Sequence, residues 1–108
     1  MIGIRGVAAI AFALASGFGA SANAKTIDVV IAHFAFAPAS IEVDAGDTVV
    51  FTNRDIVPHT ATAIDGSWTT TDIASGKSEV IVMPADGDGA YFCKYHPTMK
   101  GRLIIKAP

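Results

Sequence analysis

The chain has 108 residues, of which 51% are hydrophobic, and its 8 basic and 10 acidic residues give a formal net charge of −2 at pH 7. A nucleic-acid-binding protein needs a basic surface with clustered lysines and arginines, so this balance argues against that class. A single cysteine excludes an internal disulfide framework, and binding to a metal is one way to protect a lone thiol in an exported protein.

The first 24 residues have the pattern of an export signal. Arg5 supplies the positive start, residues 6–18 are almost wholly apolar, and Ala22-Asn23-Ala24 is a small-x-small cleavage motif. The apolar run is shorter than the roughly 20 residues that span a bilayer, which makes a membrane anchor the weaker alternative. We therefore expect cleavage after Ala24.

The remaining residues, 25–108, are expected to form one small domain. They carry 7 basic and 10 acidic side chains, a formal charge of −3 once Arg5 is removed. Their 84 residues are enough for one hydrophobic core but not for two. Because no other stretch is long and apolar enough to cross a membrane, we expect a soluble product that does not bind membrane. We also expect a periplasmic monomer that binds no nucleic acid.

Short runs of β-branched residues, separated by turn formers, recur along this domain. The sequence predicts strands over residues 26–32, 47–53, 79–83 and 102–106. Glycine-containing turns lie between the runs, and no segment has the apolar period of a capped helix. This pattern is typical of an all-β protein, and we predict a Greek-key β-sandwich.

Apolar residues two positions apart predict the side of each strand that faces the core. Tyr91, in a late strand, has two interpretations: a tyrosine corner, in which the hydroxyl bonds the backbone, or ordinary cross-strand packing. The core expected between two facing sheets comprises Ile27, Val29, Ile31, Phe34, Phe36, Ile41, Val43, Val49 and Phe51.

The loop that follows Tyr91 carries the most informative pattern. Cys93, His96 and Met99 have the spacing Cys-x2-His-x2-Met, and a loop of this length allows the three side chains to point at one spot. His59, at the start of another run, is the candidate fourth ligand. A soft thiolate, two imidazoles and a weak thioether are the donors of an electron-transfer copper site.

Each of these residues has an ordinary alternative when it is considered alone. A free cysteine is commonly a small buried hydrophobe, and a methionine commonly fills a core. A loop histidine is commonly exposed, but four separate explanations leave the shared spacing without a reason. His33 is different, because it has no partner at ligand spacing, and we expect it at the surface and outside the site.

The chain resembles the cupredoxins of the plastocyanin and pseudoazurin group, and its short ligand loop is most similar to that of amicyanin. The resemblance covers nearly the whole domain and is carried by residues 34–38, 41–49, 52–55, 58–60 and 91–101. It implies an eight-stranded sandwich and a type 1 copper centre. In that centre His59 and His96 would each bind through one ring nitrogen, Cys93 through sulfur and Met99 axially.

Two positions depart from the family pattern. The family usually has asparagine directly after the first ligand histidine, where it ties the copper-bearing loops together, whereas this chain has Thr60, whose hydroxyl offers a related bond. Tyr95 and Thr98 stand in a ligand loop that is more apolar in amicyanin, so we expect a more polar docking face.

The resemblance implies a soluble carrier of single electrons between periplasmic redox partners, such as a c-type cytochrome or a periplasmic dehydrogenase. We expect His59 to be buried and His96 to lie at the surface as the port for electrons. Near it we expect a small apolar docking patch, formed by Ile56, Val57, Pro58 and Pro97. Steering of an acidic partner is expected from Lys94, Lys100 and Arg102.

Two further classes of function are weighed against this one. A periplasmic copper carrier or store without a redox role is the main alternative, although the chain has only 3 methionines, whereas such carriers commonly present Met-rich clusters. An enzyme is not expected, because no motif around Cys93 supports a nucleophile and metal ligation would consume the thiolate. Zinc is a possible substitute for copper in the same pocket.

Overall fold

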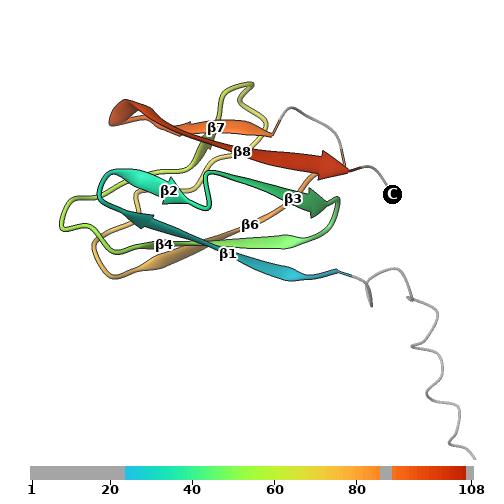
Figure 1. Ribbon diagram of the computed structural model, residues 1–108, viewed down its shortest axis with the longest axis horizontal. Coiled ribbons are helices and arrows are strands. Elements are labelled where there is room, and N and C mark those ends of the chain that lie inside the picture. Colours follow the sequence, from blue (N-terminus) through green and yellow to red (C-terminus); the bar gives the residue numbers. More distant parts are fainter. Residues whose placement is uncertain (1–23, 86–88, 107–108) are drawn as a thin grey trace, which may run out of the picture.

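The computed structural model describes residues 24–85 and 89–106, so the expected export signal falls outside the described residues except for Ala24 (Figure 1). The described residues form eight strands: β1 (Thr26–Ala32), β2 (Ala35–Ala37), β3 (Ser40–Asp44), β4 (Thr48–Asn53), β5 (Thr62–Ala63), β6 (Ser78–Val82), β7 (Ala90–Cys93) and β8 (His96–Lys106). No helix among the described residues has the length and apolarity needed to span a membrane.

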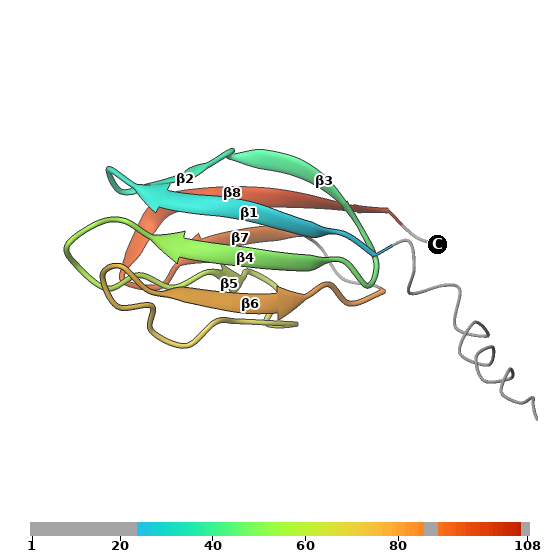
Figure 2. The same cartoon turned by 90° about the horizontal axis from the view of Figure 1, so that it is seen from below.

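The strands form two packed four-stranded sheets, one with the order β2-β1-β4-β6 and the other with the order β3-β8-β7-β5 (Figures 1 and 2). Two of the pairings, β1 with β4 and β3 with β8, are parallel, because the chain crosses from one sheet to the other between their members. This arrangement confirms the predicted all-β Greek-key sandwich of about eight strands.

Three of the four predicted strands need corrected boundaries, and the one predicted over residues 47–53 begins at Thr48. The last strand begins at His96 rather than at Arg102, since Cys93 pairs directly with His96 across a tight turn and the pairing continues along β8. The predicted strand 79–83 runs from Ser78 to Val82. Its burial alternates only weakly, because β6 lies at the edge of its sheet.

Most of the predicted core residues are buried between the sheets, but Phe34 is not. Its side chain is 50% exposed, because Phe34 lies in the turn between β1 and β2 with a positive φ of 58°, which turns it out of the alternation of the strands. Ile27 and Ile41 are partly buried against the core. The remaining predicted members are buried: Val29, Ile31, Phe36, Val43, Val49 and Phe51.

Tyr91 packs at the centre of an aromatic cluster, with its ring centroid 4.6 Å from that of Phe36 and 5.6 Å from that of Trp68. Its hydroxyl is buried and has no hydrogen-bond partner among the described residues, so the tyrosine-corner interpretation is wrong and the packing interpretation is confirmed. Burial raises the pKa of the Tyr91 phenol. The ring lies over Gly101, where a Cβ atom would come 2.3 Å from the ring carbon Cζ.

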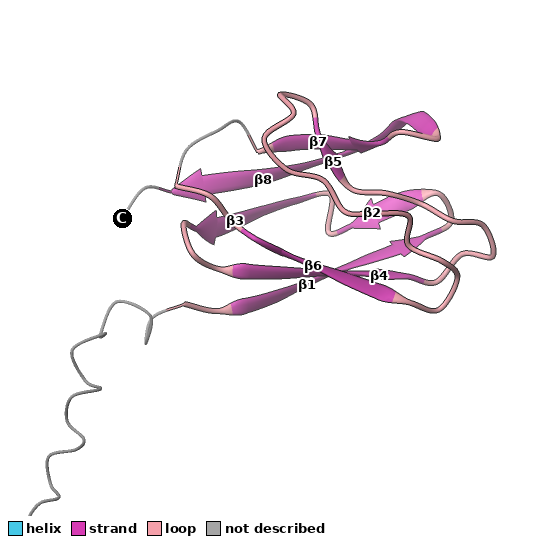
Figure 3. Cartoon of the chain, turned by 180° about the vertical axis from the view of Figure 1, so that it is seen from behind, coloured by secondary structure: helices cyan, strands magenta, loops and turns pink. Residues whose placement is uncertain are grey.

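Loops gather at both ends of the sandwich (Figure 3). One end carries the β1–β2 turn, the β4–β5 loop and the β7–β8 turn, which bring together segments far apart in the sequence. The opposite end carries the beginning of β1, the end of β8 and the β3–β4 turn. The first of these ends holds the candidate ligands.

Candidate metal centre

Three of the four predicted ligands converge at the loop end of the sandwich. His59 lies in the β4–β5 loop, Cys93 ends β7 and His96 begins β8. One donor atom from each lies within 4.8 Å of the others. Cys93 and His59 are fully buried, whereas His96 is partly exposed, in agreement with the predicted difference in burial between the two histidines. Met99, the fourth, is 4% exposed on the inward face of β8.

The distances between the donor atoms fit a single metal ion. The Cys93 Sγ atom lies 3.6 Å from His59 Nδ1 and 3.8 Å from His96 Nδ1. A metal ion bonds nitrogen at about 2.0 Å and sulfur at about 2.3 Å. When these two bonds meet at a trigonal angle, the nitrogen and sulfur atoms lie roughly 3.7 Å apart, so the same single ion fits both pairs of donors. Two imidazoles and a thiolate in this arrangement suit copper, and the thioether of the buried Met99 is a donor type that would fit the same metal.

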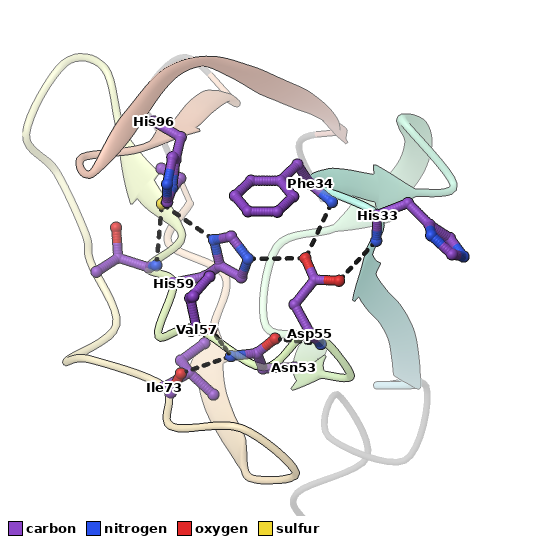
Figure 4. A network of polar contacts seen from close by, with 10 residues as sticks. His33, Phe34, Asn53, Asp55, Val57, His59, Ile73 and His96 are labelled. Atoms are coloured by element: carbon purple, nitrogen blue, oxygen red, sulfur yellow. Dashed lines mark hydrogen bonds and ion pairs between the residues drawn. The ribbon is translucent and has the colours of Figure 1, made fainter.

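Asp55 contacts the nitrogen of the His59 ring that points away from Cys93. Its carboxylate lies 2.8 Å from His59 Nε2 and accepts hydrogen bonds from the backbone N–H groups of His33 and Phe34 at 2.7 and 2.9 Å (Figure 4). Burial alone would raise the pKa of Asp55, but these three hydrogen bonds outweigh it and hold that pKa below its usual range. An ionised Asp55 favours the proton on Nε2, which leaves Nδ1 free to bind a metal.

Asn53 fixes the loop that carries both Asp55 and His59. Its side-chain oxygen accepts the backbone N–H of Asp55 at 2.8 Å, and its amide nitrogen donates to the carbonyls of Val57 and Ile73, each at 2.8 Å (Figure 4). Ile73 in turn exchanges backbone hydrogen bonds with His59. The buried amide therefore positions the loop before any metal binds.

Thr60 makes the bond that its hydroxyl was expected to offer. Its Oγ1 accepts the backbone N–H of Lys94 at 3.1 Å and lies 3.0 Å from the Thr62 hydroxyl. The backbone N–H of Thr60 donates to Cys93 Sγ at 3.4 Å. Thr60 thus connects the loop that carries His59 to Lys94, the residue that follows Cys93. Its N–H also places a hydrogen-bond donor on the sulfur of Cys93, which stabilises a thiolate.

Phe34 and His33 occupy consecutive positions with positive φ, 58° and 54°. The Phe34 ring packs edge-on against both His59 and His96, with centroid distances of 5.3 and 4.8 Å. The side chain of His33 points away from the site, as predicted (Figure 4). Asp55 stabilises this costly backbone conformation by accepting both N–H groups.

Tyr95 connects the ligand loop to a neighbouring loop. Its hydroxyl donates to Asp72 Oδ2 at 2.7 Å, and the ammonium of Lys94 lies 5.5 Å from the centre of its ring. The hydrogen bond to Asp72 is the main cause that raises the pKa of the Tyr95 phenol. Because Tyr95 directly precedes His96, this bond restrains the more exposed histidine.

Comparison with known proteins identifies the family. The family model of the cupredoxin-like domain matches residues 6–105, and the chain belongs to this family. Amicyanin-alpha of Methylorubrum extorquens is 28% identical over 90 residues, which cover 79% of this chain and 76% of that protein.

Solved structures agree with this assignment. An oxidised methionine-to-leucine variant of amicyanin has a TM-score of 0.68 at 24% identity, with 74% of this chain and 81% of that chain covered. A purple cupredoxin from Nitrosopumilus maritimus has a TM-score of 0.64 at 22% identity, with 74% and 99% covered, and these two likenesses concern the fold. The copper-containing nitrite reductase of Thermus scotoductus matches 77% of this chain with a TM-score of 0.69 at 27% identity, but this chain spans only 23% of its length.

Proposed function

We propose that this protein is an exported type 1 copper protein that carries single electrons between periplasmic redox partners. In this proposal His59, Cys93, His96 and Met99 hold one copper ion. The observation that carries it is the convergence of two Nδ1 atoms on a buried thiol, 3.6 and 3.8 Å from Cys93 Sγ. Bound copper would supply reversible one-electron chemistry between its cuprous and cupric states.

The chain's own residues favour electron transfer over storage. Asp55, Asn53 and Thr60 hold the ligand loops through partly buried hydrogen bonds, so the donors are positioned before the metal arrives. A site that does not rearrange between oxidation states presents a small structural barrier to electron transfer. A carrier that passes copper to another protein would instead need ligands that open, and this network opposes such opening.

The surface around His96 suits a brief encounter with a partner. Phe34 and Ile56, 50% and 91% exposed, add apolar area beside the exposed Pro58 and Pro97. The basic residues of the predicted steering set are exposed and can attract an acidic partner such as a c-type cytochrome or a periplasmic dehydrogenase: Lys94, Lys100 and Arg102. We propose that the chain itself is not an enzyme, because a copper ion held by four protein donors would have no open position for a substrate.

Reversible redox cycling tests the proposal. Copper-loaded protein should be reduced and reoxidised repeatedly by small-molecule reagents without loss of metal, and electron self-exchange should be fast. Release of copper at each reduction would support the alternative function, a periplasmic copper carrier or store without a redox role. A variant in which Lys94, Lys100 and Arg102 are replaced by glutamate should react more slowly with an acidic partner at low salt.

A further inference from the structure

The end of the sandwich opposite the candidate metal centre holds a buried carboxylate, that of Asp47, which accepts a hydrogen bond from the backbone of Lys25. Asp47 is fully buried, and its Oδ1 accepts the backbone N–H of Lys25 at 2.8 Å. Its Oδ2 accepts the backbone N–H of Asp44 at 2.9 Å. The carboxylate therefore binds the very nitrogen that follows the expected cleavage site after Ala24.

The charges of this cluster do not balance in the uncleaved chain. The Lys25 ammonium lies 3.0 Å from Asp44 Oδ2 and 3.5 Å from Asp47 Oδ2, so one cation is shared between two carboxylates. Lys106 is also close to the β3–β4 turn in the described part of the chain, but its ammonium lies 3.4 Å from the carboxylate of Glu42. A buried carboxylate without a full countercharge is costly, and the cluster is short of one positive charge.

We infer that cleavage after Ala24 supplies this charge, because the new α-ammonium of Lys25 forms an ion pair with Asp47 and stabilises the mature domain. Hydrolysis of the Ala24–Lys25 amide by a signal peptidase consumes one water, leaving a carboxylate on Ala24 and an ammonium on Lys25. Two ammonium groups then face two carboxylates. The inference rests on the proposed export, since the signal must be removed at this bond.

The position of Lys25 is fixed independently of its charge. Its carbonyl accepts the N–H of Thr48 at 2.8 Å, and β1 pairs with β4 from the next residue onward. If the chain began one residue earlier, the nitrogen of Lys25 that contacts Asp47 would remain an uncharged amide. The α-ammonium would then lie about 3.8 Å further along the chain, on Ala24. The gain is therefore specific to one cleavage position.

The ion pair makes stability depend on pH in two ways, because Asp47 loses its charge at low pH and the α-ammonium loses its charge at high pH. Hydrogen bonds from the N–H groups of Asp44 and Lys25 hold the pKa of Asp47 below its usual range, so this contribution is lost as pH falls through the folded pKa. The α-ammonium should titrate above its ordinary pKa of about 8, so its contribution is lost as pH rises through the raised value. The other charged groups at the cluster are Asp44 and the Lys25 side chain.

The test compares three proteins that share residues 25–108 and differ only at the start: Lys25 with a free amine, Lys25 acetylated on that amine, and Ala24 with a free amine. At pH 6 the first should have an unfolding equilibrium constant roughly tenfold lower than the other two. The difference should shrink at alkaline pH. NMR titration of the labelled α-amine should give a raised pKa in the first protein only.

Two variants keep the test decisive. Asp47→Asn should abolish the difference between the Lys25 and Ala24 starts. If this variant fails to fold, Lys25→Met provides the second arm, because removal of the side-chain ammonium leaves the α-ammonium as the sole cation and should enlarge the difference. Equal stability of the three proteins together with an ordinary α-amine pKa would overturn the inference.

The outcome is independent of the metal and separable from export. Mass spectrometry of the protein recovered from the periplasm reports the N-terminus, and any start other than Lys25 would contradict the proposed cleavage. The copper spectrum should be the same for all three starts, since the cluster and the metal centre lie at opposite ends of the sandwich (Figure 1).

Discussion

The hydroxyl of Thr60 accepts a hydrogen bond from the backbone N–H of Lys94 at 3.1 Å, and this single bond joins the loop of His59 to the residue that follows Cys93. An asparagine usually occupies this position in the family. Threonine achieves the same connection with a shorter side chain, and its hydroxyl is held in turn by Thr62 at 3.0 Å.

Replacement of Thr60 by valine tests this connection. Thr60→Val keeps the shape and the N–H bond to the Cys93 sulfur but leaves the Lys94 N–H without its acceptor, which should cost about 1–3 kcal/mol of unfolding free energy. Thr60→Ser should cost less, because it keeps the hydroxyl. Denaturant unfolding of the metal-free protein measures both, with Thr26→Val as the exposed control. A Thr60→Val variant as stable as the control would refute the role of the hydroxyl.

Asp55 should tune the metal as well as the fold. Asp55→Asn keeps the size but presents an NH₂ group where a carboxylate oxygen accepts hydrogen bonds, so the His59 ring loses its anionic partner. A less basic imidazole stabilises the cupric state less, so the reduction potential should rise and cupric affinity should fall about 10- to 100-fold. Voltammetry and metal competition measure these changes, with the exposed Asp28→Asn as control. An unchanged potential would limit Asp55 to a structural role.

Phe34 should shield the two histidines from water. Phe34→Ala removes a ring that contacts both imidazoles, which should cost about 1 kcal/mol of stability and lower the reduction potential, since nearby water favours the more highly charged cupric site. Phe34→Leu should restore part of the potential. If the alanine and leucine variants had equal potentials, shielding by the ring would not be the cause.

The two tyrosines of the chain should both ionise late. Hydrogen bonding to Asp72 raises the pKa of Tyr95, and burial raises that of Tyr91, so ultraviolet titration should find no phenol at the ordinary pKa of about 10. A folded pKa above the unfolded one means that the contribution of Tyr95 to stability is lost as pH rises through its folded value. Asp72→Asn should bring one phenol, that of Tyr95, back towards the ordinary range. Two late phenols in this variant would contradict the assignment.

The sandwich and the convergence of Cys93 and His96 are predictable from the sequence, because strand alternation and the Cys-x2-His spacing are local patterns. His59 lies 34 residues before Cys93, so its place at the site is predicted by its donor type and by the family resemblance. The partners that hold those ligands are not predictable in this way. The sequence does not distinguish Asp55 from other loop carboxylates, because its hydrogen-bond partners are backbone groups of the distant β1–β2 turn. Hydrophobicity alone predicts Phe34 in the core, because it does not reveal that two consecutive residues adopt positive φ.

The optical and EPR spectra of the copper-loaded protein test the central claim most directly. A thiolate-to-copper charge-transfer band of high intensity in the visible region and a small copper hyperfine splitting are expected, because the Cys93 thiolate would share the unpaired electron with the metal. Cys93→Ser should lose both features. A pale cupric protein whose spectrum is the same with and without the thiol would contradict the account.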